Sequence, residues 1–243
     1  MSYDSFAKYY DCLMADADYS RRAEYYHDIL TSNGAGKGIL LDLGCGTGNM
    51  SVLMNNFGYE VIGTDSSVGM LMKAREKTAG LDILLLNQPM EELDLYGTVD
   101  CAISALDCIN HLSGKEAVQK AFDSVSLFMV KDGVFVFDVN TVFKHRTALA
   151  DNCYVIENDD VYCVWQNSLC EDDSIDISLD FFTEENGVYT RESEYFTERA
   201  YPVSEIESML GKAGFETLAI YDDLTFSPVR DDSLRAVFVA KKR

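Results

Sequence analysis

The sequence predicts an α/β fold in which a doubly wound, mostly parallel sheet of seven strands carries an antiparallel β-meander insertion. Short apolar runs alternate with segments of helical periodicity up to about residue 148. These runs are apolar throughout, as in parallel strands covered by helices on both faces. Between about Asp151 and Arg199 the hydrophobic period changes to two, which indicates antiparallel strands with one solvated face. We therefore expect one core with an insert.

The N-terminal segment is rich in tyrosine and has its apolar residues at helical spacing. This spacing predicts a helix from Tyr3 to Leu30 that is broken near residues 15–18. Most of its aromatic side chains are expected to pack on the sheet, while one or two are available to cover a ligand pocket. Residues 1–35 are therefore predicted to form a helical cap.

The core is predicted to comprise residues 36–148 and 200–243. Apolar runs place its strands at residues 39–42, 59–65, 81–86, 98–104, 134–139, 215–221 and 234–240. The third of these is expected to be buried, and the pair Asp132–Gly133 predicts a turn before the fifth.

Helix starts in the core are indicated by capping residues. Ser66 or Ser67 is placed to cap the helix that follows the second strand. Two sequences have the Ser-x-x-Glu pattern of a capping box, Ser113–Glu116 and Ser204–Glu207, and each is predicted to open a helix. Gly58 is expected at the position just after a helix end.

Residues 149–199 are predicted to form an antiparallel β lid inserted after the fifth strand. Its strands are expected at 162–170, 175–183 and 188–198, with a hairpin turn at Glu185–Gly187. Residues 151–200 hold 14 acidic residues against two arginines. A solvated outer face explains most of these carboxylates, and the inner face is expected to roof a substrate pocket.

Charge and cysteine content limit the partners. The formal net charge of −21 opposes nucleic acid or a membrane as the main partner. The seven cysteines include no Cys-x-x-Cys pair, so we expect free thiols and no metal site. Neither a signal peptide nor a long apolar run is visible, which predicts a cytoplasmic protein. Its oligomeric state is left open between monomer and homodimer.

A glycine-rich turn between a buried strand and a helix, Ile39–Ser51, is the strongest signal of a ligand site. Glycines at every second position allow a ligand to approach the backbone at a helix N-terminus. A dinucleotide fingerprint would require glycine where the chain has Asn49. A phosphate-binding P-loop would require lysine directly after Gly48. Both alternatives fit poorly, which also disfavours an NAD-dependent oxidoreductase.

The run Asp42–Gly48, the acidic strand end at Asp65 and the capped helix that follows it resemble class I S-adenosylmethionine-dependent methyltransferases. Over nearly the whole chain the pattern is similar to the small-molecule N- or O-methyltransferase branch with a β-meander lid. The resemblance implies a Rossmann-like methyltransferase fold and S-adenosylmethionine as cofactor. It also implies methyl transfer to nitrogen or oxygen of a small cytoplasmic acceptor.

The resemblance assigns roles to individual residues. Asp65 is expected to bind the two ribose hydroxyls, because a carboxylate accepts two hydrogen bonds from a cis-diol; the alternative role is a helix N-cap. Asp42 is expected to lie beneath the loop and orient it. The remaining cofactor-binding residues implied are Tyr10, Gly44, Cys45, Gly46, Gly48, Ser66, Gln88, Pro89, Met90 and Ser104.

The segment after the third strand departs from the family pattern. Residues 87–93 align with the common Gln-Asp-Met motif and place Pro89 where an acidic residue contacts adenine. Adenine recognition then rests on Gln88, the Met90 backbone and apolar packing. This departure motivates an alternative function, a catalytically silent S-adenosylmethionine-binding regulatory protein of the same fold.

Candidates for catalysis follow the fourth strand, where ligands bind at the carboxyl edge of an open sheet. Asp107, Asn110 and His111 are expected in the pocket, with His111 either a general base or a structural histidine. Tyr9 or Tyr10 is expected to close over the cationic sulfur, and Tyr10 is the one predicted to act in catalysis and in cofactor binding. Asp138 and Asn140, which end the fifth strand, are expected to face the acceptor. A large basic protein remains an alternative acceptor.

Overall fold

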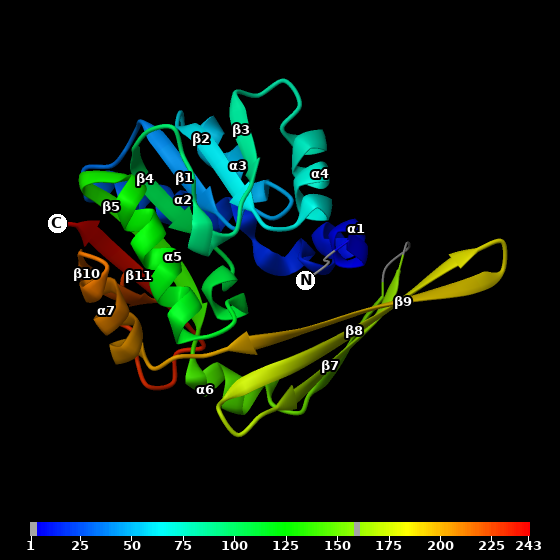
Figure 1. Ribbon diagram of the computed structural model, residues 1–243. Helices are drawn as coiled ribbons and strands as arrows, with labels where there is room; N and C mark the ends of the chain where they lie inside the picture. Colours follow the sequence, from blue (N-terminus) through cyan, green and yellow to red (C-terminus); the bar gives the residue numbers. More distant parts are fainter. Residues whose placement is uncertain (1–3, 158–160) are drawn as a thin grey trace.

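The computed structural model describes residues 4–157 and 161–243 and contains two separate sheets (Figure 1). The larger has the strand order β10-β11-β5-β4-β1-β2-β3. From β5 to β3 neighbouring strands are parallel, whereas β11 is antiparallel to both β5 and β10. The predicted fold class is confirmed. The strands are β1 (Ile39–Leu43), β2 (Glu60–Asp65), β3 (Ile83–Asn87), β4 (Val99–Ser104), β5 (Met129–Asn140), β10 (Phe215–Asp222) and β11 (Arg235–Lys242).

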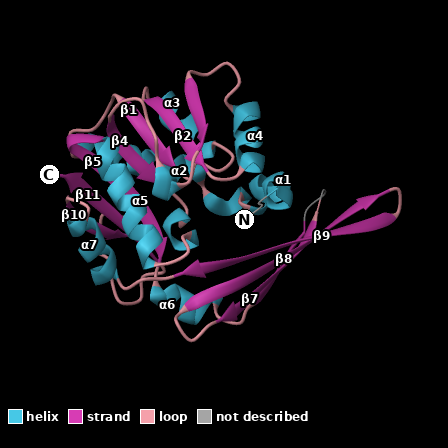
Figure 2. Cartoon of the chain, in the orientation of Figure 1, coloured by secondary structure: helices cyan, strands magenta, loops and turns pink. Residues whose placement is uncertain are grey.

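Helices cover both faces of this sheet (Figure 2). Side chains of β5 alternate between two cores: Phe135 and Phe137 pack with α5 and α7, whereas Val134 and Val136 pack with α2 and α3. Burial on both faces explains why the strands are apolar throughout. The helices are α1 (Asp4–Leu13), α2 (Tyr19–Ser32), α3 (Asn49–Asn56), α4 (Val68–Lys77), α5 (Lys115–Phe128), α6 (Val142–Lys144) and α7 (Val203–Lys212). Tyr3, where the first helix was expected to begin, lies outside the described residues.

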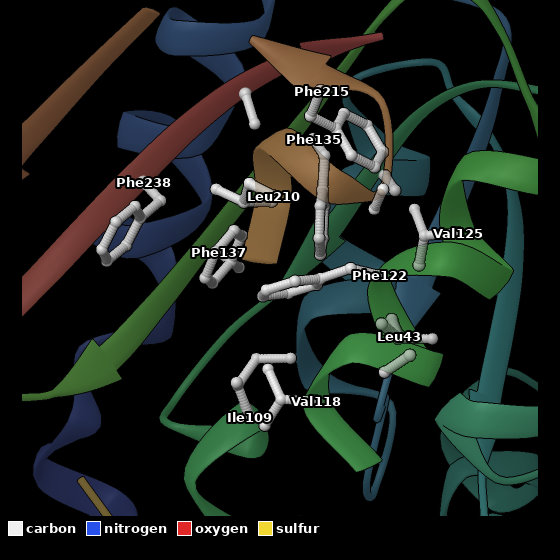
Figure 3. Close-up of a cluster of buried hydrophobic side chains, with 14 of the residues drawn as sticks. Leu43, Ile109, Val118, Phe122, Val125, Phe135, Phe137, Leu210, Phe215 and Phe238 are labelled. Carbon is white, nitrogen blue, oxygen red and sulfur yellow. The ribbon is translucent and has the colours of Figure 1, made fainter. Parts of the chain in front are cut away.

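A cluster of phenylalanines fills the space between the sheet and α5 (Figure 3). The ring of Phe137 stacks on Phe238 of β11 at 5.1 Å and lies 5.3 Å from Phe122 of α5. Truncating a buried phenylalanine typically costs about 3–5 kcal/mol. This packing holds β5 and β11 together beside their polar ends, where Arg235 pairs with Asp138.

The second sheet is antiparallel in the order β6-β7-β8-β9, and its β8–β9 hairpin extends beyond the body of the molecule (Figure 1). On β8 the buried residues Ile175, Ile177, Leu179 and Phe181 alternate with more exposed ones, as the period of two predicted. The sequence predicted three strands and missed a fourth, whose residues are mostly exposed. The strands are β6 (Cys153–Glu157), β7 (Tyr162–Leu169), β8 (Ser174–Glu185) and β9 (Val188–Arg199).

Both predicted capping boxes are wrong. Helix α5 begins at Lys115 after an extended Gly114, and no side chain caps it. Helix α7 begins at Val203, because Pro202 already has the φ that a helix entry needs and Ser204 falls inside the first turn. The other caps are confirmed: the Ser67 hydroxyl accepts the Met70 N–H at 3.2 Å, and Gly58 follows the end of α3 with a φ of 93°.

Two strand predictions also need correction. Strand β5 starts at Met129, directly after α5, so Asp132–Gly133 is an irregularity within the strand rather than a turn before it. Asp132 has a φ of 66°, and a Cβ on Gly133 would lie 2.6 Å from the Met129 side chain. Strand β3 is the edge of the sheet, and Leu84 is 51% exposed, so this strand is not buried as expected.

Candidate functional site

The glycine loop joins β1 to α3 at the carboxyl edge of the parallel strands. Gly44, Gly46 and Gly48 have φ values of 74°, 53° and 82°, which favour glycine. A Cβ on Gly44 would lie 2.5 Å from the methyl group of Met90 and 3.0 Å from the Cys108 sulfur. A Cβ on Gly46 would meet nothing within 4 Å. Gly44 therefore allows Met90 and Cys108 to pack closely against the loop, whereas the space beside Gly46 is open.

Asp65, at the end of β2, is held against this loop. Its Oδ2 accepts the Gly46 N–H at 2.9 Å and its Oδ1 accepts the Ser67 N–H at 2.8 Å. Burial raises the pKa of the Asp65 carboxyl, and these two N–H groups and His111 act in the opposite direction. Each carboxylate oxygen has a further lone pair, so the oriented Asp65 can accept hydrogen bonds from a ligand diol. Ser67, not Asp65, is the N-cap of α4.

A cavity of about 290 Å³ lies above Asp65 and the loop. Beneath the loop a smaller cavity of about 30 Å³ is lined by residues that include Asp42, Cys45 and Tyr10. Six of the residues predicted for the site line neither cavity: Gly48, Ser104, Asp107, Asn110, Asp138 and Asn140. Asn110 is fully buried, and its amide donates to the Asn140 carbonyl at 3.1 Å and to the Arg199 carbonyl at 2.9 Å, so it is not in the pocket as predicted. The predicted residues that line the larger cavity are Tyr10, Gly44, Gly46, Asp65, Ser66, Gln88, Pro89, Met90 and His111.

One wall of the cavity is apolar because the Gln88 amide is engaged elsewhere. The Gln88 Nε2 donates to the Asp94 carbonyl at 2.9 Å, and its Oε1 accepts the Asp94 N–H at 3.0 Å. Pro89, Met90 and Met70 therefore provide the surface beside Asp65. A flat apolar slot of this kind suits a heteroaromatic base.

Several lining residues were missed by the sequence reasoning. Glu91 adds a carboxylate two residues after Pro89. The others have no sequence signal that separates them from core residues, because they are apolar or small and come from three distant segments. They are Phe6, Met70, Leu106, Cys108, Leu112 and Ser113.

Two predicted cofactor residues have structural partners. The Ser104 hydroxyl is fully buried and donates to the Leu43 carbonyl at 2.8 Å, which ties β4 to β1. Asp42 is 1% exposed, and its Oδ2 accepts the Ser51 hydroxyl at 2.5 Å. Burial raises the pKa of Asp42 to about 7, although the hydrogen bond from Ser51 favours the charged form. Asp42 thus fixes the start of α3 below the loop.

Asp42→Asn should change how stability depends on pH. Because a carboxyl in an unfolded chain titrates near pH 4, the stability contributed by Asp42 is fully present below about pH 4 and is lost as the pH rises through about 7. The difference in free energy of unfolding, variant minus wild type, should therefore increase with pH in this window. The increase should be at most about 1.4 kcal/mol per pH unit. Urea denaturation of both proteins at pH 5 and pH 8 measures this difference. A difference that is equal at both values contradicts the prediction.

The N-terminal helix is anchored to the loop. Asp11 of α1 accepts the Thr47 hydroxyl at 2.7 Å and pairs with Lys77 of α4 at 2.6 Å. Tyr10 consequently lines both cavities, and burial raises its pKa well above the usual value, so its hydroxyl stays neutral. Tyr9 instead stacks on Phe181 of the antiparallel sheet at 5.0 Å. Of the two tyrosines, Tyr10 is the one that covers the site.

Asp138 and Asn140 were predicted to face the acceptor, but neither lines the cavity. Asp138 is fully buried, accepts the Tyr26 hydroxyl at 2.6 Å and pairs with Arg22 and Arg235. Asn140 is buried and donates to Glu198 at 3.0 Å. Both side chains are used to join strand ends, so neither is available to a substrate.

His111 lines the cavity and lies near two carboxylates. Its Nε2 is 3.8 Å from Asp107 Oδ2 and 3.8 Å from Glu198 Oε1. One nitrogen of His111 and one oxygen of each carboxylate all lie within 4.8 Å of one another. Burial would raise the pKa of Asp107, but the charges of Arg235 and Lys144 lower it overall, so Asp107 is ionised. Glu198 was missed, because the sequence does not distinguish it from the other acidic residues of the insert.

These features define a nucleoside-binding protein of the methyltransferase type. The sheet is an open α/β sheet with a glycine loop after β1, a carboxylate at the end of β2 and an apolar slot after β3. The residues fit S-adenosylmethionine. Asp65 can take the ribose, the slot at Pro89 and Met90 can take the adenine, and Tyr10 with the open loop can take the methionine part.

Comparisons with known proteins agree with this class. A family model described as a methyltransferase domain matches residues 40–133. The chain is 33% identical over its whole length to the putative methyltransferase YqeM of Bacillus subtilis, covering 98% of that protein. A crystal structure of an S-adenosylmethionine-dependent methyltransferase from Clostridium acetobutylicum matches with a TM-score of 0.89 and 28% identity, covering 99% of this chain and 98% of that one. The chain belongs to the class I S-adenosylmethionine-dependent methyltransferases.

Proposed function

We propose that this enzyme transfers the methyl group of S-adenosylmethionine to nitrogen or oxygen of a small cytoplasmic acceptor. The observation that supports a small acceptor most directly is the size of the cavity. Phe6 and Tyr10 of α1 and His111 line a single cavity of about 290 Å³. Among the described residues, no helix is both long and apolar enough to cross a membrane.

Relatives support nitrogen as the target. The glycine/sarcosine N-methyltransferase of Aphanothece halophytica is 24% identical, over 92% of this chain and 82% of that protein. The sugar N-methyltransferase KedS8 from Streptoalloteichus has the same fold, with a TM-score of 0.81 at 19% identity. Both names describe methylation of an amine, and the carboxylates beside His111 suit a basic acceptor.

The proposed roles follow from position. S-adenosylmethionine supplies a methyl group on a sulfonium, which is a good leaving group. Asp65 and the glycine loop hold the cofactor, and the face of the Tyr10 ring suits its cationic sulfur. Residues 149–199 act as the lid, since Phe181 and Phe196 pack with α1 beside the cavity. Binding in one cavity places the two reactants close together in a fixed orientation, which supplies much of the acceleration.

Calorimetry with S-adenosylhomocysteine and a transfer assay test this proposal. We expect micromolar binding, and transfer of label from methyl-labelled S-adenosylmethionine to a component of a small-molecule cell extract. Absence of binding would refute the proposal. Binding without transfer to any component would favour the catalytically silent alternative, which Pro89 and the engaged Gln88 amide motivate.

A further inference from the structure

We propose that Glu198 is a positioning residue which, together with Asp107, makes His111 the proton acceptor for a cationic amine. The inference rests on the proposed methyl transfer and names its substrate class. Glu198 lies on β9, 87 residues after His111 in the sequence, and reaches it only through the packing of the two sheets.

Glu198 is fixed in place on the side away from His111. Its side chain is 6% exposed, and its Oε2 accepts the Asn140 amide at 3.0 Å. Asn140 is itself held, because its N–H donates to Asn110 Oδ1 at 2.9 Å. These contacts direct the other oxygen, Oε1, to within 3.8 Å of His111 Nε2.

Asp107 is the second carboxylate near His111 Nε2, and it is also fixed by a partner. Its Oδ1 pairs with Arg235 at 2.6 Å, and its Oδ2 lies 3.8 Å from His111 Nε2. The Phe196 ring packs against the imidazole with centroids 5.3 Å apart. Two carboxylates thus lie near Nε2 and an aromatic ring packs on the imidazole, while His111 still lines the cavity.

The histidine that neighbours Glu198 does not neutralise it. His145 Nδ1 lies 2.8 Å from the Asp173 carbonyl, so Nδ1 carries the hydrogen. Burial lowers the pKa of His145, so the ring is neutral and Nε2 presents a lone pair. This Nε2 is buried without a hydrogen-bond partner and lies 3.7 Å from Glu198 Oε2. The charge of Glu198 is therefore directed to the His111 side.

The balance of charges favours a monovalent cation in this region. Lys144, whose pKa is lowered by burial and by Arg235, lies among the same groups. Asp65 faces His111 from β2. A divalent ion would be placed close to Arg235 and Lys144, which already act on Asp107, whereas an ammonium or an imidazolium adds only one positive charge. Ion pairs join Asp107, Asp138 and Asp223 to Arg22 and Arg235, whereas the Lys144 ammonium donates to Asn140 Oδ1 at 2.7 Å.

The chemistry explains why an amine needs this group. An ammonium nitrogen has no lone pair, so its N–H bond must break and the proton moves to His111 Nε2. The freed nitrogen lone pair then forms the new bond to the methyl carbon as the carbon–sulfur bond breaks, and the sulfur keeps that electron pair. Asp107 and Glu198 stabilise the positive charge that forms on His111.

Glu198→Gln tests the positioning role in the free protein, without turnover. With ¹³C-labelled histidine, three ring signals are followed by NMR across pH 5–9, and His111→Gln assigns one of them. We expect the His111 signal to change at lower pH in Glu198→Gln than in wild type, and to be restored toward wild type in Glu198→Asp. Glu216→Gln removes an exposed carboxylate from β10 and should leave the signal unchanged. An identical His111 titration in wild type and Glu198→Gln would overturn the proposal.

The substrate class is tested separately. A cell extract is divided by ion exchange into cationic, neutral and anionic small molecules, and each fraction is incubated with methyl-labelled S-adenosylmethionine. Label in the cationic fraction is expected, with the acidic limb of the pH profile of kcat/KM moved to lower pH in Glu198→Gln. Label only in compounds that carry no amino group overturns the amine assignment, and label in none refutes the proposed function instead. Binding of Mg²⁺, Mn²⁺ or Zn²⁺ that Glu198→Gln abolishes would identify a metal site and overturn the proposal.

Discussion

Replacing Asp65 by alanine should weaken the binding of S-adenosylhomocysteine by at least about 100-fold. Hydrogen bonds to a charged acceptor contribute about 1.5–3 kcal/mol each, and a ribose offers two hydroxyls to this carboxylate. The loss has a second cause. Asp65 also accepts the Gly46 N–H at 2.9 Å and the Ser67 N–H at 2.8 Å, so alanine releases the loop and the start of α4.

Isothermal titration calorimetry with S-adenosylhomocysteine measures this loss. Asp82→Ala, which removes an exposed carboxylate just before β3, is the matched control and should bind as wild type does. Asp65→Asn should fall between the two, since its amide oxygen retains part of the acceptor function. Thermal unfolding of each variant shows whether the fold persists. Wild-type affinity in a folded Asp65→Ala variant would show that the ribose is bound elsewhere.

Periodicity predicted the fold well because burial determines it directly. Strands covered on both faces have to be apolar throughout, and β8 has to alternate, so each pattern reports its environment. Prediction was weaker at the edges. Leu84 has the residue type of a core strand but lies on an edge strand, and β6 is mostly exposed. Helix starts were mispredicted where the local backbone, as at Pro202, determined the first turn.

The glycine loop and Asp65 could be placed at one cavity because they lie at strand ends. The loop follows β1 and Asp65 ends β2, so topology alone brings them together. The surroundings of His111 depend on tertiary contacts. Glu198 meets His111 only because β9 packs on the segment after β4, and no local pattern encodes that meeting. Asp138 shows the opposite error. Its position at a strand end suggested a contact with substrate, but its carboxylate pairs with Arg22 and Arg235.

Arg235→Met should cause the largest loss of stability. Arg235 is 11% exposed and pairs with Asp107 at 2.6 Å and with the fully buried Asp138. Methionine fills similar space but leaves both carboxylates without this cation. Removing one partner of a buried ion pair typically costs about 3–5 kcal/mol, because the remaining charge is uncompensated. For a chain of this size that corresponds to a fall in Tm of roughly 10 °C.

Thermal unfolding of three proteins separates this cause from lost packing. Arg230→Met, which removes an arginine 63% exposed beside Asp222 and Asp232, should change Tm little, since exposed ion pairs contribute about 0–1 kcal/mol. The double variant Arg235→Met with Asp138→Asn should recover part of the stability, because the stranded charge is removed. No recovery would mean that shape, not charge, is what Arg235 supplies. Recovery would show that the ends of β5 and β11 are joined electrostatically, which is why Asp138 is unavailable to a substrate.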